Sequence, residues 1–397
     1  MQQGKTPVFF RIFVGSMGDI VIQKVSKKAD MERFVRFNAE LYKGCPWAVP
    51  DFLEDTLNTF STEKNAAFEF CRAEWFLALK DDKIVGRVVA FINDRANEKW
   101  HRHTVRFGWI DFIDDEEVSR ALLDTVAQWG RERGMTEMHG PLGFTDMDPE
   151  GMLVEGFETL STMSTIYNYP YYPTHFEHYG MEKETDWLQR CVAVPHKGDP
   201  GWARYSKVAD MVSKRYGLKV HKFKSKKEIM AGGYDIKFFE TINKSYAPLF
   251  GYSTMTDKQM KSYAEQYLKF LDPRLLSIVE NDKDEVVAVA ACMPSLSKAL
   301  QKADGKLLPW GWWHLLKALY WKHDDILDLL LIGVVPEYQD KGAVTLIFAD
   351  LLPTIDEMGF KWAEVHPQLE DNTRGLGIWD VFNSTIHKRR RAWKKTL

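Results

Sequence analysis

One stretch, residues 326–355, limits most strongly what this chain can fold into. The apolar run Ile326–Pro336 predicts a buried strand, and Gly342 follows it in a short polar turn. Apolar residues then recur at helical spacing: Leu346, Ile347, Leu351, Leu352 and Ile355. A strand, a tight turn and a helix start present unpaired N–H groups at the positive end of the helix dipole. Because glycine has no Cβ, a diphosphate could approach the backbone closely at Gly342.

The turn also carries a motif. Gln339-x-x-Gly342-x-Val344, after a strand ending Val-Val-Pro, resembles the acyl-CoA signature Q/R-x-x-G-x-G/A of the GNAT acyltransferase superfamily. Val344 departs from the small third residue of that signature. The resemblance implies that the loop holds the diphosphate of an acyl-CoA through Val334, Val335, Gln339, Asp340, Lys341, Gly342, Ala343 and Val344. An ordinary β-turn-α unit with no ligand remains the alternative.

The residues after this helix continue the resemblance. A second strand, Lys361–His366, precedes Asn372, which opens a short helix, and a basic strand lies near the C-terminus. This is similar to the order of the second half of a GNAT domain, and it implies that Asn372 contacts the cofactor. The basic run Lys388–Lys395 is expected to form a solvated strand edge, where cations resist edge pairing, rather than to contact nucleic acid. A role in holding the cofactor's phosphates stays open.

The chemistry implied by the resemblance is acyl transfer to an amine. A backbone N–H near Val334 would polarise the thioester carbonyl, and a general base would take the proton of the amine. Glu364 and His366 are the catalytic candidates, with Asp328 as a third choice. Many GNAT enzymes carry a tyrosine after the asparagine, but residues 373–382 contain none. His387 or water would then protonate the thiolate, or catalysis would be lost.

The sequence also repeats itself in outline. Residues 73–92 and 275–294 each alternate apolar and polar residues around a polar turn, which predicts two hairpins. Each is followed later by a helix, a glycine and a strand that ends at proline. This order predicts an α/β fold with two copies of one module, residues 1–196 and 197–397, and the resemblance of the second copy implies that both are GNAT-like.

The first module departs from the pattern. Where the phosphate loop would lie, Asp114, Asp115, Glu116 and Glu117 precede the helix, and there is no glycine turn. Carboxylates suit the positive end of a helix but repel a diphosphate. The first module is therefore a degenerate copy, expected to bind no coenzyme A in the usual manner.

Three further segments supply candidates for binding the acceptor. The loop Gly140–Asp148 follows a strand, Tyr167–Pro173 is rich in tyrosine, and Leu307–Trp321 is a helix rich in tryptophan. The first two could line a substrate cleft between the modules, or they could form a rigid corner. For the third, packing in a core or between domains is favoured over an acyl pocket or a membrane surface. The candidate residues are Asp146, Tyr167, Asn168, Tyr169 and Trp312.

Composition narrows the choice further. A chain of 397 residues is expected to form two domains, and its net charge of -3 argues against a dedicated nucleic-acid binder. The four cysteines are widely spaced and form no metal pattern, so no metal is expected. No apolar run approaches the roughly twenty residues that span a bilayer, and a cytoplasmic location is expected by default.

These observations lead to one hypothesis and two alternatives. The hypothesis is an N-acyltransferase that uses acetyl-CoA or another acyl-CoA and acts on a small-molecule amine or an amino-acid-like acceptor. The first alternative is a ligand-binding GNAT-like protein without catalysis. The second is a Fem-type transferase that takes aminoacyl groups from tRNA, a reading that the charge disfavours.

Overall fold

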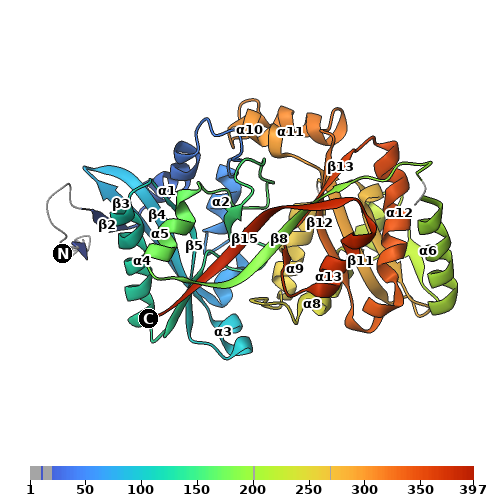
Figure 1. Cartoon of the computed structure of the whole chain (residues 1–397), viewed down its shortest axis with the longest axis horizontal. Helices are drawn as coiled ribbons and strands as arrows, with labels where there is room; N and C mark the ends of the chain where they lie inside the picture. Colours follow the sequence, from blue (N-terminus) through green and yellow to red (C-terminus); the bar gives the residue numbers. More distant parts are fainter. Residues whose placement is uncertain (1–9, 12–19, 200–201, 269) are drawn as a thin grey trace. The chain divides into compact units, whose positions relative to one another are not determined.

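The computed structural model of the chain describes residues 10–11, 20–199, 202–268 and 270–397. The chain divides into two compact units (Figure 1). Unit 1 takes in the chain as far as Trp187, together with Ala299–Trp312 and Lys388–Leu397. Unit 2 takes in Leu188–Lys298 and Trp313–His387. Unit 1 therefore includes two segments from the second half of the sequence.

The sheet of unit 1 is built around a long hairpin. β3 (Cys71–Lys80) and β4 (Lys83–Asn93) pair antiparallel, and β5 (Thr104–Phe112) pairs antiparallel with β4. Asp81 and Asp82 adopt left-handed φ angles of 49° and 58° in the turn, where short polar side chains tolerate that conformation. The hairpin expected for residues 73–92 is confirmed.

A helical crossover completes the first module. α4 (Glu116–Arg131) leads from β5 to β6 (Glu137–Gly140), which runs parallel to β5. The apolar face of α4 packs on the sheet in one hydrophobic core. The parallel pairing ends where Arg106 lies opposite His139, although β5 continues to Phe112. The two strands therefore part at the end of β6.

Unit 2 repeats this order of elements. β10 (Leu276–Glu280) and β11 (Val286–Pro294) form the second expected hairpin, and β12 (Ile326–Val334) pairs antiparallel with β11. α12 (Ala343–Glu357) then leads to β13 (Trp362–Val365), which is parallel to β12. The shared order and strand directions confirm an α/β fold with two copies of one module.

The parallel pair of unit 2 also parts before the end of its first strand. Pairing of β12 with β13 ends where Leu329 lies opposite Val365, whereas β12 continues for five more residues to Val334. On its other side, β13 pairs antiparallel with β8 (Glu182–Ala193), and Cys191 lies opposite Glu364.

Helices cover both faces of this sheet. Ala288 and Ala290 of β11 belong to the core cluster that includes α12, which also packs against α6 (Trp202–Tyr216). Gly333, the partner of Val289 on β12, lies close to α8 (Tyr234–Tyr246). Since neighbouring residues of a strand point to opposite faces, α8 and α12 lie on opposite sides of the sheet.

β15 (Ser384–Thr396) differs from the sequence expectation. It pairs with β6 and also with β7 (Met152–Glu155), and the side chains of Lys388 and Arg390 are 1% and 0% exposed. The expected solvated edge is therefore wrong, because this strand lies inside the sheet. The buried Asp186 balances two of its basic residues: Arg391 Nε donates to Asp186 Oδ1 at 2.8 Å, and Arg389 pairs with Asp186 at 3.4 Å.

The other described elements complete the two units. No helix among the described residues is long and apolar enough to cross a membrane. The remaining strands are β1 (Phe10–Arg11), β2 (Val21–Lys24), β9 (Lys219–His221) and β14 (Gln368–Leu369). The remaining α-helices are α1 (Lys28–Leu41), α2 (Leu53–Thr59), α3 (Asp94–Trp100), α5 (Tyr171–His178), α7 (Lys226–Ala231), α9 (Asp257–Leu268), α10 (Ser297–Ala303), α11 (Gly311–Tyr320) and α13 (Thr373–Gly377). Short 3-10 helices span Ala66–Glu69, Pro273–Leu275, Pro336–Lys341 and Ile378–Val381.

Candidate functional site

The N-terminus of α12 is open to an anion. The turn Pro336–Lys341 leads to Gly342, whose φ of 75° places it in the left-handed region. No side chain caps the first turn of α12, and that turn contains no acidic residue. The first N–H groups of a helix have no partner within the helix, and they carry the positive end of its dipole. This end therefore suits a diphosphate, as the motif implies.

The corresponding end of α4 is closed by its own side chains. Asp115 Oδ1 accepts a hydrogen bond from the Glu117 N–H at 3.0 Å, and Glu116 and Glu117 stand in the first turn. Lys80 Nζ forms an ion pair with Asp115 at 2.8 Å. A carboxylate thus already occupies the place that an anionic ligand would take in the first module, which is consistent with the expected degeneracy of that copy.

The loop before α12 is held in place by side chains at its rim. Gln339 Nε2 donates to the Val334 carbonyl at 3.2 Å, and Arg374 Nη1 donates to Gln339 Oε1 at 2.9 Å. Arg374 also pairs with Asp340 at 3.4 Å. Lys341 Nζ lies 4.1 Å from the centre of the Tyr338 ring. Two cations, Lys341 and Arg374, therefore accompany the loop.

The residues that follow the loop pack inward. Ala343 is fully buried, and Val344 packs against the core cluster that contains it. A Cβ at Gly342 would lie 3.0 Å from Val212 Cγ2 of α6. Glycine is therefore needed at position 342 for two reasons, the left-handed backbone and the close approach of α6.

Two main-chain amides at the end of β12, where the sequence predicted contacts with the cofactor, are already engaged. The Val334 N–H donates to Ser245 Oγ at 3.1 Å, and the Val335 N–H donates to the Val287 carbonyl at 2.9 Å. Tyr246, next to Ser245 on α8, donates from its hydroxyl to the Ile332 carbonyl at 3.1 Å. The end of β12 that extends beyond β13 is thus covered by hydroxyl groups of α8.

Glu364 lies in a buried polar cluster of unit 2. Its Oε1 accepts hydrogen bonds from Gln189 Nε2 at 2.6 Å and from His387 Nε2 at 2.8 Å. Glu364 is 7% exposed and Gln189 is fully buried, whereas the His387 side chain is 20% exposed. Among the described residues, His387 Nδ1 has no hydrogen-bond partner. A carboxylate can only accept, so His387 carries its proton on Nε2 and leaves Nδ1 as a base.

The other predicted residues of this module have structural partners. Asp328 is 3% exposed and lies opposite Glu364 on the neighbouring parallel strand. His366 follows the end of β13, and its N–H donates to the Leu329 carbonyl at 3.2 Å. Asn372 caps α13, since its Oδ1 accepts from the Gly375 N–H at 3.0 Å. The structure thus brings Glu364 together with His387 rather than with His366.

Unit 1 contains a cavity of about 340 Å³. Arg87 and Asp111 form a buried ion pair in its wall, with Nη2 and Oδ2 2.6 Å apart, and Tyr42 donates to the other oxygen of Asp111 at 3.0 Å. Burial and the nearby carboxylate of Asp111 raise the pKa of the Tyr42 hydroxyl, which therefore stays protonated. Tyr167 and Asn168, both predicted substrate residues, line the same cavity.

Most of the predicted acceptor residues already have contacts within unit 1. Asn168 is committed to the backbone, since it accepts from the Leu153 N–H at 2.6 Å and donates to the Leu153 carbonyl at 3.0 Å. Tyr169 donates to the Leu41 carbonyl at 3.3 Å, and Trp312 Nε1 donates to the Pro309 carbonyl at 3.0 Å. Asp146 lies in an acidic loop. The burial of Glu150 and the negative charge of Asp146 together raise the pKa of Glu150.

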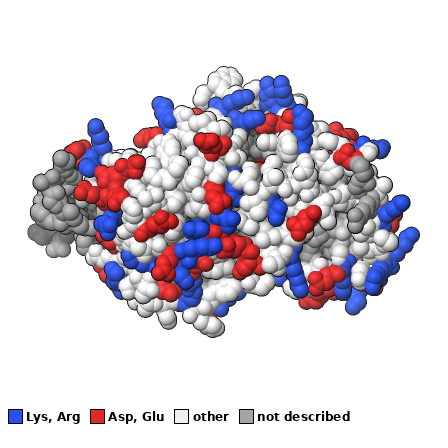
Figure 2. All heavy atoms as spheres, in the orientation of Figure 1, with Lys and Arg blue, Asp and Glu red and all other residues white. Residues whose placement is uncertain are grey.

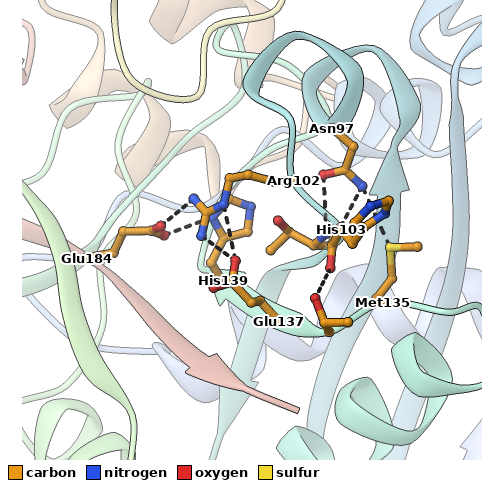
Figure 3. Close-up of polar contacts among 9 residues, drawn as sticks. Asn97, Arg102, His103, Met135, Glu137, His139 and Glu184 are labelled. Atoms are coloured by element: carbon orange, nitrogen blue, oxygen red, sulfur yellow. Dashed lines mark hydrogen bonds and ion pairs between the residues drawn. The ribbon is translucent and has the colours of Figure 1, made fainter.

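Figure 3 shows a second polar cluster of unit 1, at the parallel end of its sheet. Glu184 accepts from Arg102 Nη1 at 2.5 Å and bonds His139 Nδ1 at 2.8 Å, and Arg102 Nη2 also reaches Glu137 at 2.8 Å. Burial alone would raise the pKa of Glu184, but the His139 bond and the Arg102 charge lower it to about 2. Burial lowers the pKa of His139. The cluster ties β6 to the start of β8 and has a structural role.

Three residues of the candidate site were not found from the sequence: Ser245, Gln189 and Arg374. Ser245 lies 89 residues before the amide that it caps, and Gln189 lies 175 residues before Glu364. No local pattern links such positions.

Comparison with known proteins supports the fold. The chain has the tandem GNAT fold: a tandem GNAT protein from the clavulanic acid biosynthesis pathway superposes with a TM-score of 0.53 at 11% identity, covering 95% of this chain and 98% of that one. The GCN5-related glucosamine N-acetyltransferase region of a fungal β-N-acetylglucosaminidase also gives 0.53 at 11% identity, covering 96% of this chain and 38% of that one.

Two curated proteins are similar over almost their whole length. Protein YghO of Escherichia coli K12 is 25% identical over 394 residues, which is 95% of each chain. The bacterial ceramide synthase of Caulobacter vibrioides is 24% identical over 394 residues, covering 97% of this chain and all of that protein. No family model matches the chain. Among the described residues, no group of three His, Cys, Asp or Glu side chains is placed to hold a metal ion.

Proposed function

We propose that the chain is an acyl-CoA-dependent N-acyltransferase that works through its second module. The observation that carries the proposal is the difference between two equivalent helix ends. α12 starts at a left-handed glycine with no side-chain cap, whereas α4 is capped by Asp115 and followed by two glutamates. Only the first of these ends suits a diphosphate electrostatically.

The cofactor would be held by the main chain of the α12 start. The N–H groups of Gly342, Ala343 and Val344 would bind the diphosphate, with Lys341 and Arg374 as neighbouring cations. Three residues would support the cofactor site indirectly. Gln339 bonds the Val334 carbonyl, Asp340 pairs with Arg374, and Asn372 caps the helix that carries Arg374. When bound, an acyl-CoA supplies an acyl carbonyl activated as a thioester.

His387 is the proposed base. Its Nδ1 would take a proton from the amine of the acceptor as the amine nitrogen attacks the thioester carbonyl carbon. Glu364 fixes the imidazole tautomer through the Nε2 bond of 2.8 Å and stabilises the imidazolium that forms. The new C–N bond replaces the C–S bond, and the thiolate leaves with a proton from His387 or water. Glu364 is thus a positioning residue, and His366 remains a weaker candidate.

Ser245 is proposed to stand at the oxyanion position. Its Oγ accepts from the Val334 N–H, so its own hydroxyl hydrogen is directed elsewhere. A hydroxyl group fixed in this way can donate to developing negative charge on a carbonyl oxygen. The Val334 N–H, which the sequence predicted as the donor to the carbonyl oxygen, would then orient the Ser245 hydroxyl group, and that hydroxyl group would be the donor.

The acceptor is proposed to be a long-chain amino alcohol. The C. vibrioides relative is named a ceramide synthase, and a ceramide is the amide of a fatty acid with a long-chain amino alcohol. That similarity covers nearly all of both chains, which supports the same class of acceptor here. Tyr167, Asn168, Tyr169, Asp146 and Trp312 remain predictions for acceptor binding.

The test is a turnover assay with two variables. The protein is incubated with acetyl-CoA or a long-chain acyl-CoA, and with a panel of a long-chain amino alcohol, simple amines and amino acids. Thiol release is followed together with amide formation by mass spectrometry. Amide formed from the amino alcohol supports the proposal. No amide product from any acceptor in the panel would overturn it.

Binding measurements beside the turnover assay separate the alternatives. Binding of coenzyme A in calorimetry, with no product from any acceptor, would favour a ligand-binding protein without catalysis. A salt-dependent complex with aminoacyl-tRNA, and no affinity for coenzyme A, would favour the Fem-type reaction.

A further inference from the structure

The segment from Leu307 to Lys322 turns its aromatic side chains outward. In helix α11, Gly311, Leu315 and Leu319 are buried and recur every four residues, so they form the face that packs against the protein. Trp312 and Trp313 lie off this face and are 41% and 45% exposed. An ordinary surface helix places polar residues there.

The residues on either side of the helix extend this apolar surface. Leu308 and Trp310 precede α11 and are 73% and 70% exposed. Tyr320 ends the helix and Trp321 follows it, with exposures of 53% and 66%. Trp310 and Trp321 therefore do not pack in a core, which was one of the two kinds of packing that the sequence favoured. We call these six residues, namely Leu308, Trp310, Trp312, Trp313, Tyr320 and Trp321, the aromatic strip.

Part of the strip is prearranged. The Trp313 and Trp321 rings lie 5.5 Å apart at an angle of 33°, and Trp321 also contacts Tyr320 edge to face at 6.3 Å. Rings packed on one another lose little further freedom when they meet an apolar phase. Exposed clusters of large apolar side chains usually mark a binding surface.

The segment that carries the strip is basic. Residues 297–322 contain five lysines and a single acidic residue, Asp304. Lys302, Lys306, Lys317 and Lys322 are all exposed, and Figure 2 shows lysine and arginine side chains gathered over α10 and α11 at the top of the view. The chain as a whole carries a net charge of -3, so this segment has the opposite sign to the average.

Tryptophan and tyrosine beside lysine form the combination that suits the boundary between lipid headgroups and acyl chains. Indole and phenol rings are amphipathic and favour that boundary, while lysines meet anionic headgroups. We propose that the aromatic strip docks on an anionic lipid surface, with α11 lying in the plane of the interface. The inference concerns binding alone and does not depend on the proposed reaction.

Vesicle sedimentation of the full chain tests the docking. The probes are vesicles of phosphatidylcholine with and without phosphatidylglycerol. The protein is expected to sediment with the anionic vesicles and to be released by salt, since the lysine contribution is screened. No binding to either vesicle, or equal binding to both, would overturn the proposal.

Paired variants locate the surface. Trp310→Ser with Trp313→Ser is expected to lower the partition coefficient by about tenfold or more, because two rings lose contact with the interface. Lys302→Gln with Lys317→Gln is expected to lower it by about fivefold per lysine removed, at low salt. Trp362→Ser is the matched control, because Trp362 is 47% exposed on a strand outside the strip. An equal loss in the control would refute the assignment.

Self-association is the competing use of an apolar surface, and the same variants decide it. Sedimentation velocity of the unmodified protein is expected to give a monomer in the absence of vesicles. A dimer that becomes monomeric in Trp310→Ser with Trp313→Ser would assign the strip to a second copy of the chain instead.

Discussion

His387 Nε2 lies 2.8 Å from Glu364 Oε1, which also accepts from Gln189 Nε2 at 2.6 Å. The second bond fixes the carboxylate, and the carboxylate fixes the imidazole. Glu364 is 7% exposed, so its charge is poorly screened by water and acts mainly on the histidine. A base with a defined tautomer thus results from three strands that meet in unit 2.

His387→Ala should lower kcat by about 10²–10⁴-fold, because a positioned general base contributes about that much. The KM for acyl-CoA should change little, since the diphosphate site lies at α12. Glu364→Gln should lower kcat less and should also shift the acid limb of the pH–rate profile, because the imidazolium loses its carboxylate partner. Steady-state kinetics over a range of pH measures both effects. A Glu364→Gln enzyme with an unchanged pH profile would make Glu364 a merely structural residue.

Ser245→Ala should lower kcat by about tenfold or more if the hydroxyl stabilises negative charge on the carbonyl oxygen. The Val334 N–H would lose its partner, and stability should fall by about 1 kcal/mol. Ser277→Ala serves as the control, because Ser277 is a fully buried serine of β10 in the same unit. Equal kinetic effects of the two substitutions would remove Ser245 from the site.

Local chemistry made part of this architecture predictable. The hairpin turns, the glycine at position 342 and the acidic start of α4 all depend on residues within a few positions of one another. Such features follow from backbone preferences and dipole electrostatics. The existence and order of the two modules followed from them.

Long-range pairing was not predictable in the same way. The basic residues of β15 were expected at a solvated edge, but acids such as Asp186, far away in the sequence, balance them inside a sheet. The contact of Glu364 with His387 was not predicted either, because it depends on β15 lying close to β13, and the two residues are 23 positions apart. Core packing was one of the arrangements favoured for Leu307–Trp321, but Trp310 and Trp321 are exposed.

Gly342→Asp should abolish binding of coenzyme A. The new carboxylate would repel the diphosphate, and its Cβ would lie 3.0 Å from Val212 Cγ2. Isothermal titration calorimetry with coenzyme A measures the loss. Gly359→Asp is the matched control, because Gly359 has a φ of 79° after the other end of α12 and no atom lies within 4 Å of a Cβ placed there. The control shares the backbone strain but should retain binding, and unchanged affinity in Gly342→Asp would place the cofactor elsewhere.

Glu184→Gln should destabilise unit 1 in a pH-dependent manner. The folded-state pKa of Glu184 is about 2, below the ordinary 4.5, so its ionised form stabilises the fold above pH 4.5 and this contribution is lost as the pH falls through 2. The difference corresponds to about 3 kcal/mol at neutral pH, as an upper limit for a side chain that is 6% exposed. Urea unfolding at pH 7 should therefore separate the variant from the unmodified protein by up to this amount, and the gap should narrow at pH 3. Glu182→Gln, an exposed change on the same strand, should have little effect at either pH. A gap that stays constant between pH 7 and pH 3 would mean that the carboxylate charge does not hold this cluster together.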